Sequence, residues 1–468
     1  MQRTAFATRG AILERILLAH TAHKKELDVT ERRLENMATA VGRVPNDVLI
    51  CIFTMARFEY DVAPEVLASV CHKWMAVVHG AHGALLWSKI DLIVGYQDET
   101  IMLAERTIRH LNRSRNYPIS CNLGAETYED ISADAMDLLR SVVRASMSRC
   151  TKLVLASFHQ FESWFPLDGP LILKKLEIKE SGSNIKGASP TLLPEAGCPS
   201  LRELRLTIEG YLRRAPGFVS SVLSNVSQFA SITCLYIDVE GAILEVRDAL
   251  GSFHDLKHLV WHDYGMREEV NEDESVALSL PKLERLELQH HIQLRALSRL
   301  TAPMLRCLKS EYDMANPVHG ALLSPVRFPN LEALWCSTGC WDMGRVADVI
   351  TPHPKLRNVW WHIPVGSLSE CIGTLSSLMS EQPSRPFLHR LDWLSIPVID
   401  VHSSRSSMHA DIAFQLSKFA ILRNQLPAKC QPQFKLCLDA ALVTKSPRIA
   451  RVVQKYPDII FPSIHTFE

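Results

Sequence analysis

The chain has 468 residues, 47% of them hydrophobic, and its 51 basic residues balance 51 acidic residues. A formal net charge of zero gives no overall electrostatic reason to bind nucleic acid or an anionic membrane. The chain is also too long for one ordinary compact domain, unless it consists of repeats that pack only on their neighbours.

Twelve cysteines are spread from Cys51 to Cys437 without a CxxC pair or a zinc-ligand spacing. This usage is typical of an intracellular protein whose reduced thiols fill core positions. No apolar run reaches the length of a membrane span, and charged residues interrupt the start where a secretory signal needs an apolar region. We therefore expect a cytoplasmic and/or nuclear protein.

Residues 1–40 are predicted to carry one amphipathic helix, which begins near residue 11. Leu27, Leu34 and Val41 recur every seven residues, and Glu and Lys fill the other faces. The heptads are too few to drive dimerisation alone, so a helix that packs on the next segment of the chain is preferred to a coiled coil.

Residues 41–90 are predicted to form a small helical module. Pro45 suits the first turn of a helix, and Val48, Leu49, Ile52 and Phe53 then share one broad apolar face. A second helix is predicted from Glu65 to Val78. A unit of about 45 residues cannot easily bury so many bulky side chains, so the rest of the chain or a partner must cover them.

Three separated motifs in this module resemble the F-box, in particular that of the fungal F-box proteins. They are Val44-Pro45-x-Asp47-Val48-Leu49-x-x-Ile52-Phe53, then Val70-Cys71-x-x-Trp74, then Leu86-Trp87. Val44 stands where the family usually has Leu, and Asp47 where it usually has Glu. The resemblance implies binding to the Skp-type linker of a cullin–RING ubiquitin ligase. The linker-binding residues that it implies are Pro45, Val48, Leu49, Ile52, Phe53, Val70, Trp74, Leu86 and Trp87. We expect the stretch from Pro45 to Phe53 to face mainly the partner, and Trp87 to be shared with the module's interior.

A motif of the form Leu-x-x-Leu-x-apolar recurs along the rest of the chain. Between Leu173 and Leu388 its mean step is about 27 residues, a spacing typical of leucine-rich repeats. The motifs begin at Cys150, Leu173, Leu201, Ile232, Leu256, Leu283, Leu305, Leu331, Leu356 and Leu388.

Helix-like segments lie between these motifs, at 129–147, 216–229 and 343–351. The predicted fold class is therefore α/β: a helical F-box followed, over residues 115–468, by an irregular leucine-rich-repeat solenoid with a curved parallel sheet. An entry strand is expected at 119–123, a closing strand at 434–438 and a C-terminal cap at 457–468. Loops are expected at 181–199 and at the acidic run 266–275. For the acidic run, a solvent-exposed loop is the preferred interpretation, and binding of a basic target is the alternative.

No catalytic, cofactor-binding or metal-binding motif occurs. GxxxxGK[ST], GxGxxG after a strand, HExxH and GxSxG are all absent. His290 and His291 would point to opposite faces of a strand, and Cys336 and Cys340 are not expected to bind a metal. An enzyme assembled on the repeats is retained only as a rival hypothesis.

The alternation of a strand separates core residues from surface residues within each repeat. Trp261, Trp361 and Trp393 take the last inward position, which predicts burial. The outward slot between the second and third apolar residues would line the concave face. There Trp335 and Trp360 hold the same place in consecutive repeats and could anchor a partner, unless another segment folds over them. The candidate target-binding residues are Tyr236, Arg285, Trp335, Trp360 and Arg390.

The sequence thus predicts a non-enzymatic substrate adaptor that holds a target protein near a ubiquitin-charged enzyme. The alternative is a protein-interaction scaffold of the same fold outside any ligase. The sequence decides neither the target, nor a need for its phosphorylation, nor the oligomeric state.

Overall fold

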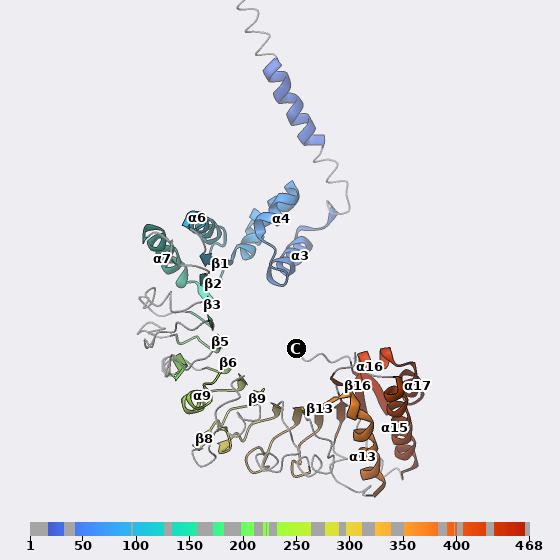
Figure 1. Ribbon diagram of the computed structural model, residues 1–468. Coiled ribbons are helices and arrows are strands. Elements are labelled where there is room, and N and C mark those ends of the chain that lie inside the picture. Colours follow the sequence, from blue (N-terminus) through green and yellow to red (C-terminus); the bar gives the residue numbers. More distant parts are fainter. Residues whose placement is uncertain are drawn as a thin grey trace, which may run out of the picture. The chain divides into compact units, whose positions relative to one another are not determined.

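Figure 1 presents the computed structural model of the chain. It describes residues 17–31, 43–94, 97–125, 133–156, 172–181, 198–209, 219–220, 222–223, 232–263, 277–289, 296–310, 323–337, 351–381, 391–396, 398–399, 406–426 and 435–463. These residues fall into two compact units, Met1–Thr151 and Lys152–Glu468. The division lies within strand β3, so α6, β2 and α7 belong with the helical module.

The first unit combines short helices with two parallel strands. Residues 17–31 are helical. The other elements are α3 (Asn46–Phe58), α4 (Pro64–Val70), α5 (His72–His79), the 3₁₀ helix η1 (Ala81–Trp87), β1 (Lys89–Val94), α6 (Gln97–Arg113), β2 (Ile119–Ala125) and α7 (Ala133–Met147). β1 and β2 pair in parallel, and α6 and α7 lie side by side (Figure 1).

The predicted helix from Glu65 to Val78 is wrong as a single element. Cys71 has an extended backbone, with φ −161° and ψ 167°, so α4 ends at Val70 and α5 begins at His72. The predicted strand at 119–123 is confirmed as β2, although β1 precedes it and was not predicted.

The second unit is dominated by a large parallel sheet. Its elements are β3 (Cys150–Ala156), β4 (Lys175–Ser181), β5 (Glu203–Glu209), β6 (Cys234–Val239), α9 (Ile243–Leu250), β7 (His258–His262), β8 (Leu278–Ser279), β9 (Arg285–Leu288), β10 (Leu300–Thr301), β11 (Cys307–Ser310), β12 (Ala333–Ser337), β13 (Asn358–Pro364), η6 (Val365–Ser367), α13 (Leu368–Glu381), β14 (Trp393–Ile396), β15 (Val398–Ile399), α15 (Ser406–Gln425), β16 (Lys435–Asp439), α16 (Ala440–Lys445), α17 (Pro447–Lys455) and β17 (Ile460–Ser463).

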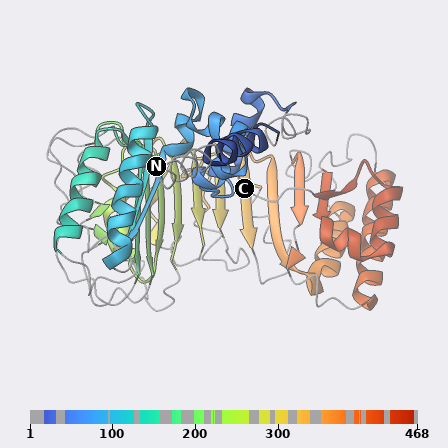
Figure 2. The same ribbon diagram turned by 90° about the horizontal axis from the view of Figure 1, so that it is seen from above.

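The strands of the main sheet pair in chain order, from β4 through β7, β9, β11 to β14 and β16 to β17. Figure 2 shows them, coloured from green to orange, as a row of arrows that point the same way. β8 and β10 form a separate parallel pair, and β15 pairs with the end of β13. Helices α13 and α15 pack together near the end of the unit.

The register of the sheet follows the repeated leucine. Leu204 pairs with Leu235, Leu235 with Leu259, and Leu259 with Leu286, each the second apolar residue of its motif. These leucines are at most 1% exposed, and Trp261 is fully buried as predicted. In β6 buried residues alternate with half-buried ones, because neighbouring strand residues point to opposite faces.

The last predicted motif is displaced by three residues. Val359 pairs with Leu394, so the tenth motif is Leu391-x-x-Leu394-x-Ile396 and does not start at Leu388. Leu391, Leu394 and Ile396 are all buried. Trp393 consequently pairs with Asn358, before the repeated leucine, and does not hold the last inward position.

The end of the unit has one strand more than predicted. β16 falls at the expected closing strand, but β17 pairs with it in parallel within the segment predicted as a cap. The predicted helix 129–147 is confirmed over α7, and the described residues of 216–229 are helical. The segments 182–197, 266–275 and 338–350 lie outside the described residues.

Candidate partner-binding surfaces

The buried core of the helical module takes up several residues that were expected to face a partner. Leu49 and Leu86 are at most 1% exposed, and Phe53 is fully buried, with its ring centroid 4.7 Å from that of Trp74. Trp87 is also buried, and its indole Nε1 donates a hydrogen bond of 3.0 Å to the carbonyl oxygen of Val78. The expected partner-facing role of Leu49, Phe53 and Leu86 is therefore corrected, because each fills the interior of its own module. Trp87, which was expected to be shared between a partner and the interior, also lies in this core.

A neighbouring side of α3 carries an exposed apolar stripe. Val48, Ile52 and Met55 lie at helical spacing and are 43%, 47% and 53% exposed. Pro45 is exposed just before them. On α4, Val66 and Val70 are also more than half exposed. Of the predicted docking residues, Pro45, Val48, Ile52 and Val70 thus remain available to a partner, and Trp74 is half-buried against the core.

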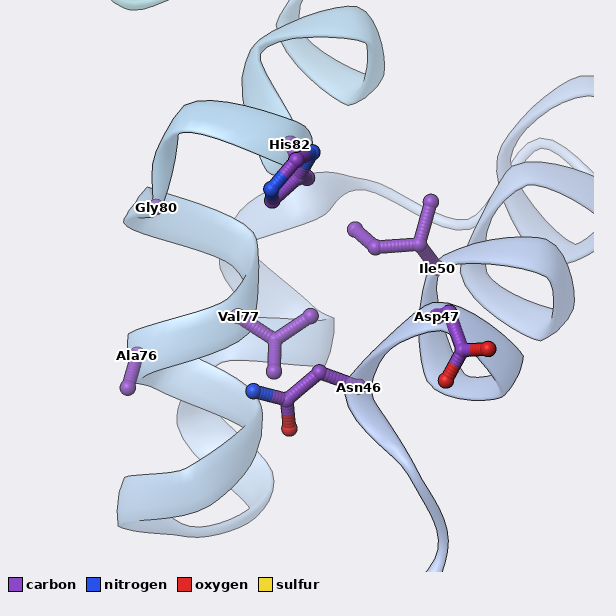
Figure 3. A pocket seen from close by; sticks show the side chains of 7 residues that line it. All are labelled: Asn46, Asp47, Ile50, Ala76, Val77, Gly80 and His82. Atoms are coloured by element: carbon purple, nitrogen blue, oxygen red, sulfur yellow. The ribbon is translucent and has the colours of Figure 1, made fainter.

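A cavity of about 450 Å³ opens between the start of α3 and the α5–η1 turn. In Figure 3, Asn46 and Ile50 of α3 lie across from Val77 of α5, with His82 of η1 beyond them. The lining residues are Asn46, Asp47, Ile50, Ala76, Val77, Gly80 and His82. The cavity gives the module a mainly apolar indentation in which a partner side chain could lodge.

A buried arginine ties α3 to the first strand. The guanidinium of Arg57 donates to Asp61 Oδ1 at 2.8 Å and to the carbonyl oxygen of Lys89 at 2.7 Å, and its side chain is 4% exposed. Asp91 Oδ2 lies 3.5 Å from the same group. This network fixes the C-terminal end of α3 against β1, so the exposed stripe lies on a firmly held helix.

A second polar contact joins α4 to α6. His110 Nε2 lies 2.8 Å from Glu65 Oε1, and Arg106 Nε lies 3.3 Å from the same oxygen. Burial alone raises the pKa of Glu65, but hydrogen bonds with His110 and with the backbone, together with the charges of His110 and Arg106, outweigh it and bring the pKa down to about 2. His110 also meets the ring of Trp87 edge-on at 5.0 Å. These contacts hold α6 against α4 and against Trp87 in the core of the module.

In the second unit, the residues between the repeated leucines form a surface that we call the polar face. Sheet pairing places Glu177, Arg205, Tyr236, Val260, Glu287, Lys309, Trp335 and Trp360 in one row across neighbouring strands. A parallel row lies two residues earlier on each strand and includes Cys234, His258 and Arg285. Alternate strand residues share a face, so both rows belong to the same surface.

The charges on the polar face gather around Glu287. Its carboxylate lies 2.5 Å from Arg285, 3.4 Å from Lys309 and 3.4 Å from His258 Nε2. Hydrogen bonds with Cys234 and with Glu287 raise the pKa of His258 to about 9. Burial alone raises the pKa of Glu287, but the bond from His258 and the charges of Arg285 and Lys309 lower it to about 2.

Aromatic side chains flank this cluster on both sides. Trp335 and Trp360 are paired residues of β12 and β13, as predicted, and both are half-buried. The ammonium of Lys309 lies 4.6 Å from the centroid of the Trp335 ring. Toward the start of the sheet, the guanidinium of Arg205 lies 3.9 Å from the centroid of the Tyr236 ring. Arginine and lysine held against aromatic rings form a stiff surface that combines charge with apolar area.

Sequence reasoning found part of this surface. It singled out Tyr236, Arg285, Trp335 and Trp360, but it did not identify the cluster around Glu287, in which His258 takes part. The signal was available, because Glu287 and Lys309 occupy the same slot of consecutive motifs. Arg390, the remaining candidate, lies outside the described residues, as do His290, His291 and Cys340.

Within the described residues, no group of three or more His, Cys, Asp or Glu side chains could hold a metal ion. The nine cysteines whose side chains the structure describes form no disulfide bond. No helix there combines the length and the apolar composition needed to cross a bilayer.

Comparison with known proteins places the chain in no family. No family sequence profile matches it, and no curated protein matches it. Among solved structures, it is similar to a crystal structure of a Bacteroides fragilis protein, a structural-genomics target, with 14% identity over 73% of each chain. The TM-score of 0.25 is too low for this likeness to support an argument about fold or function.

Proposed function

We propose that the chain is a substrate-recognition adaptor of an SCF-type cullin–RING ubiquitin ligase that acts in the cytoplasm and/or nucleus. In this proposal the helical module is an F-box that binds a Skp-type linker. The second unit is a leucine-rich-repeat solenoid whose concave side, the polar face, binds a target protein. The chain itself would supply no nucleophile or general base, and would act by raising the effective concentration of the target near the ubiquitin-charged enzyme.

The exposed stripe of α3 is the observation that carries the docking half of this proposal. Val48, Ile52 and Met55 leave apolar area in water on a helix that the Arg57 network holds in position. Burying such side chains in an interface gives about 25 cal/mol per Å² of apolar surface removed from water. Two of the three F-box-like motifs contribute exposed apolar residues: Val48 and Ile52 of the stripe belong to the first motif, and Val70 on α4 belongs to the second.

The repeated register supports the solenoid half. Parallel strands that pair in chain order, with a leucine aligned from one to the next, are what stacked strand–turn–helix repeats produce. The polar face then offers an extended surface with two adjacent tryptophans, Trp335 and Trp360. Aromatic side chains of this kind commonly dominate the binding energy of protein interfaces.

Binding of the purified chain to a recombinant Skp-type linker tests the docking half. Val48→Asp combined with Ile52→Asp should reduce the affinity at least about a hundredfold, because two charges would enter an apolar interface. Met102→Asp is the matched control, since Met102 is 63% exposed on α6, away from the stripe. Absence of linker binding by the native chain would refute the proposal.

The adaptor and the non-ligase scaffold differ downstream of the linker. An adaptor should co-purify with a cullin and shorten the lifetime of a bound protein, whereas a scaffold should leave that lifetime unchanged when the stripe is disrupted. For target capture, Trp335→Ala combined with Trp360→Ala should abolish binding while linker binding stays intact. Unchanged capture by this double variant would exclude the two tryptophans as the anchor.

A further inference from the structure

The cluster around Glu287 holds more positive than negative charge. Three cationic side chains, Arg285, Lys309 and His258, surround a single carboxylate. His258 is protonated at neutral pH because its pKa is raised to about 9. The cluster therefore keeps an excess of two positive charges.

Glu287 orients these cations but does not use all of their hydrogen-bonding groups. Its side chain is 11% exposed, whereas those of Arg285, Lys309 and His258 are 37%, 32% and 33% exposed. Within the described structure, Arg285 Nε is buried without a hydrogen-bond partner. His258 Nε2 is buried as well, so His258 contributes its charge, whereas the partly exposed side chains of Arg285 and Lys309 can reach an anion at the surface. Glu287 already holds these two side chains in place, and side chains fixed in advance lose little entropy when they bind an anion.

The neighbouring acidic side chains on the polar face already have partners of their own. Glu203 pairs with Lys175, and Glu177 lies 3.2 Å from Lys179, two and three strands before His258. On the other side, Lys309 borders the ring of Trp335. The excess positive charge therefore belongs to the Glu287 cluster itself, and the ring of Trp335 borders the cluster on one side.

We propose that the cluster formed by His258, Arg285, Glu287 and Lys309 is a binding site for one anionic group, a phosphate or a carboxylate. Arg285 pairs with Glu287 through Nη2 and has its Nε buried, so it would meet the anion with the remaining N–H groups of its guanidinium, and Lys309 adds a point charge. The identification of the natural ligand as an acidic or phosphorylated segment of the target, with an apolar residue next to the anion against Trp335, rests on the proposed function. The site itself does not.

Titration calorimetry of the full chain with three separate probes tests the site: inorganic phosphate, acetylated phosphoserine amide and acetylated glutamate amide. We expect binding that weakens as salt is added. A response to both amino-acid amides indicates a general anion site, and a response to phosphate and phosphoserine alone indicates a phosphate site. No response to any probe at about 10 mM, where a complex of even millimolar affinity would be mostly formed, would overturn the proposal.

Two variants and a control assign the binding to these residues. Arg285→Gln and Lys309→Gln should each weaken binding about tenfold, the effect of losing about 1.4 kcal/mol of a charged contact. Lys355→Gln removes one positive charge from an exposed position of the same unit, beside Asn330, and should leave binding unchanged. Equal affinity in Lys309→Gln and the native chain would also overturn the proposal, since that side chain is partly exposed and its loss should not unfold the sheet. These titrations contain no linker protein, so their failure is separate from a failure of ligase docking.

Discussion

Replacing Phe53 by alanine should destabilise the helical module far more than the same change at its neighbour Ile52. Phe53 is 0% exposed and packs on Trp74, whereas Ile52 is 47% exposed. Removing a fully enclosed phenylalanine ring costs about 3–5 kcal/mol, because the cavity left behind collapses only partly. Ile52→Ala loses little buried area and gains helix propensity, so its cost should stay below about 1 kcal/mol.

Hydrogen exchange of the full chain measures this difference segment by segment. A tenfold change in an opening equilibrium corresponds to about 1.4 kcal/mol, so a loss of about 3–5 kcal/mol in Phe53→Ala should accelerate exchange of the α3 and α5 amides by about 10²- to 4 × 10³-fold. Ile52→Ala should accelerate it by less than about fivefold. The amides of β6 and β7, in the other unit, serve as the internal control. Equal acceleration by the two variants would refute the assignment of buried and exposed sides to α3.

Three further predictions concern stability. Gly83→Ala would drive a Cβ into the backbone carbonyl oxygens of Val77 and Val78 in α5, a contact that no side-chain rotation relieves. A denaturant titration should show that the free energy of unfolding falls by about 1–3 kcal/mol, and an unchanged midpoint would argue against the close approach. Arg57→Gln leaves a carbonyl oxygen of β1 without its donor and should lower the free energy of unfolding of the first unit by about 2 kcal/mol, whereas native-like stability would show that the network is dispensable. The thermal stability of the second unit should form a plateau between about pH 4.5 and pH 6.5. The pKa of His258 is raised from 6.5 to about 9, so its contribution is complete below 6.5 and is lost as the pH rises through 9. The pKa of Glu287 is lowered from 4.5 to about 2, so its contribution is complete above 4.5 and is lost as the pH falls toward 2. A His258→Asn variant that kept the alkaline decline would contradict this assignment.

The strands of the second unit could be predicted because one physical rule governs them. An apolar residue that must be buried recurs at the same place in each motif, and its neighbours along the strand point to the opposite face of the sheet. This rule located β6, β7 and β9 and predicted that Trp335 and Trp360 are neighbours. It failed where two overlapping motifs were possible, since Leu388, Leu391 and Leu394 are spaced three apart, and only pairing with Val359 selects the correct register.

The helical module was harder to predict, because apolar residues occupy more than one side of α3. Composition showed that some of them exceed what the module can bury, but it could not show which ones. Phe53 and Ile52 are adjacent and equally apolar, and only the position of Trp74 decides which is enclosed. The extended backbone at Cys71 separates α4 from α5, and no neighbouring Pro or Gly in the sequence predicts this break.

The Glu287 cluster escaped prediction for a different reason. Its members come from three strands, β7, β9 and β11, and lie up to about fifty positions apart in the sequence, so no local motif contains them. The repeated motif aligns Glu287 with Lys309, but the diagonal contact between His258 and Glu287 becomes evident only when the pairing of the strands is known.

The pairing of each main-sheet strand of the second unit with strands close to it in sequence bears on how this unit can form during synthesis. During synthesis, each strand would find the strand that pairs with it after only a few tens of further residues. Early strands could therefore bury their leucines before the C-terminal part of the chain is made. Cutting the message short after a complete strand should therefore leave an ordered fragment on the ribosome, protected from protease up to its last paired strand.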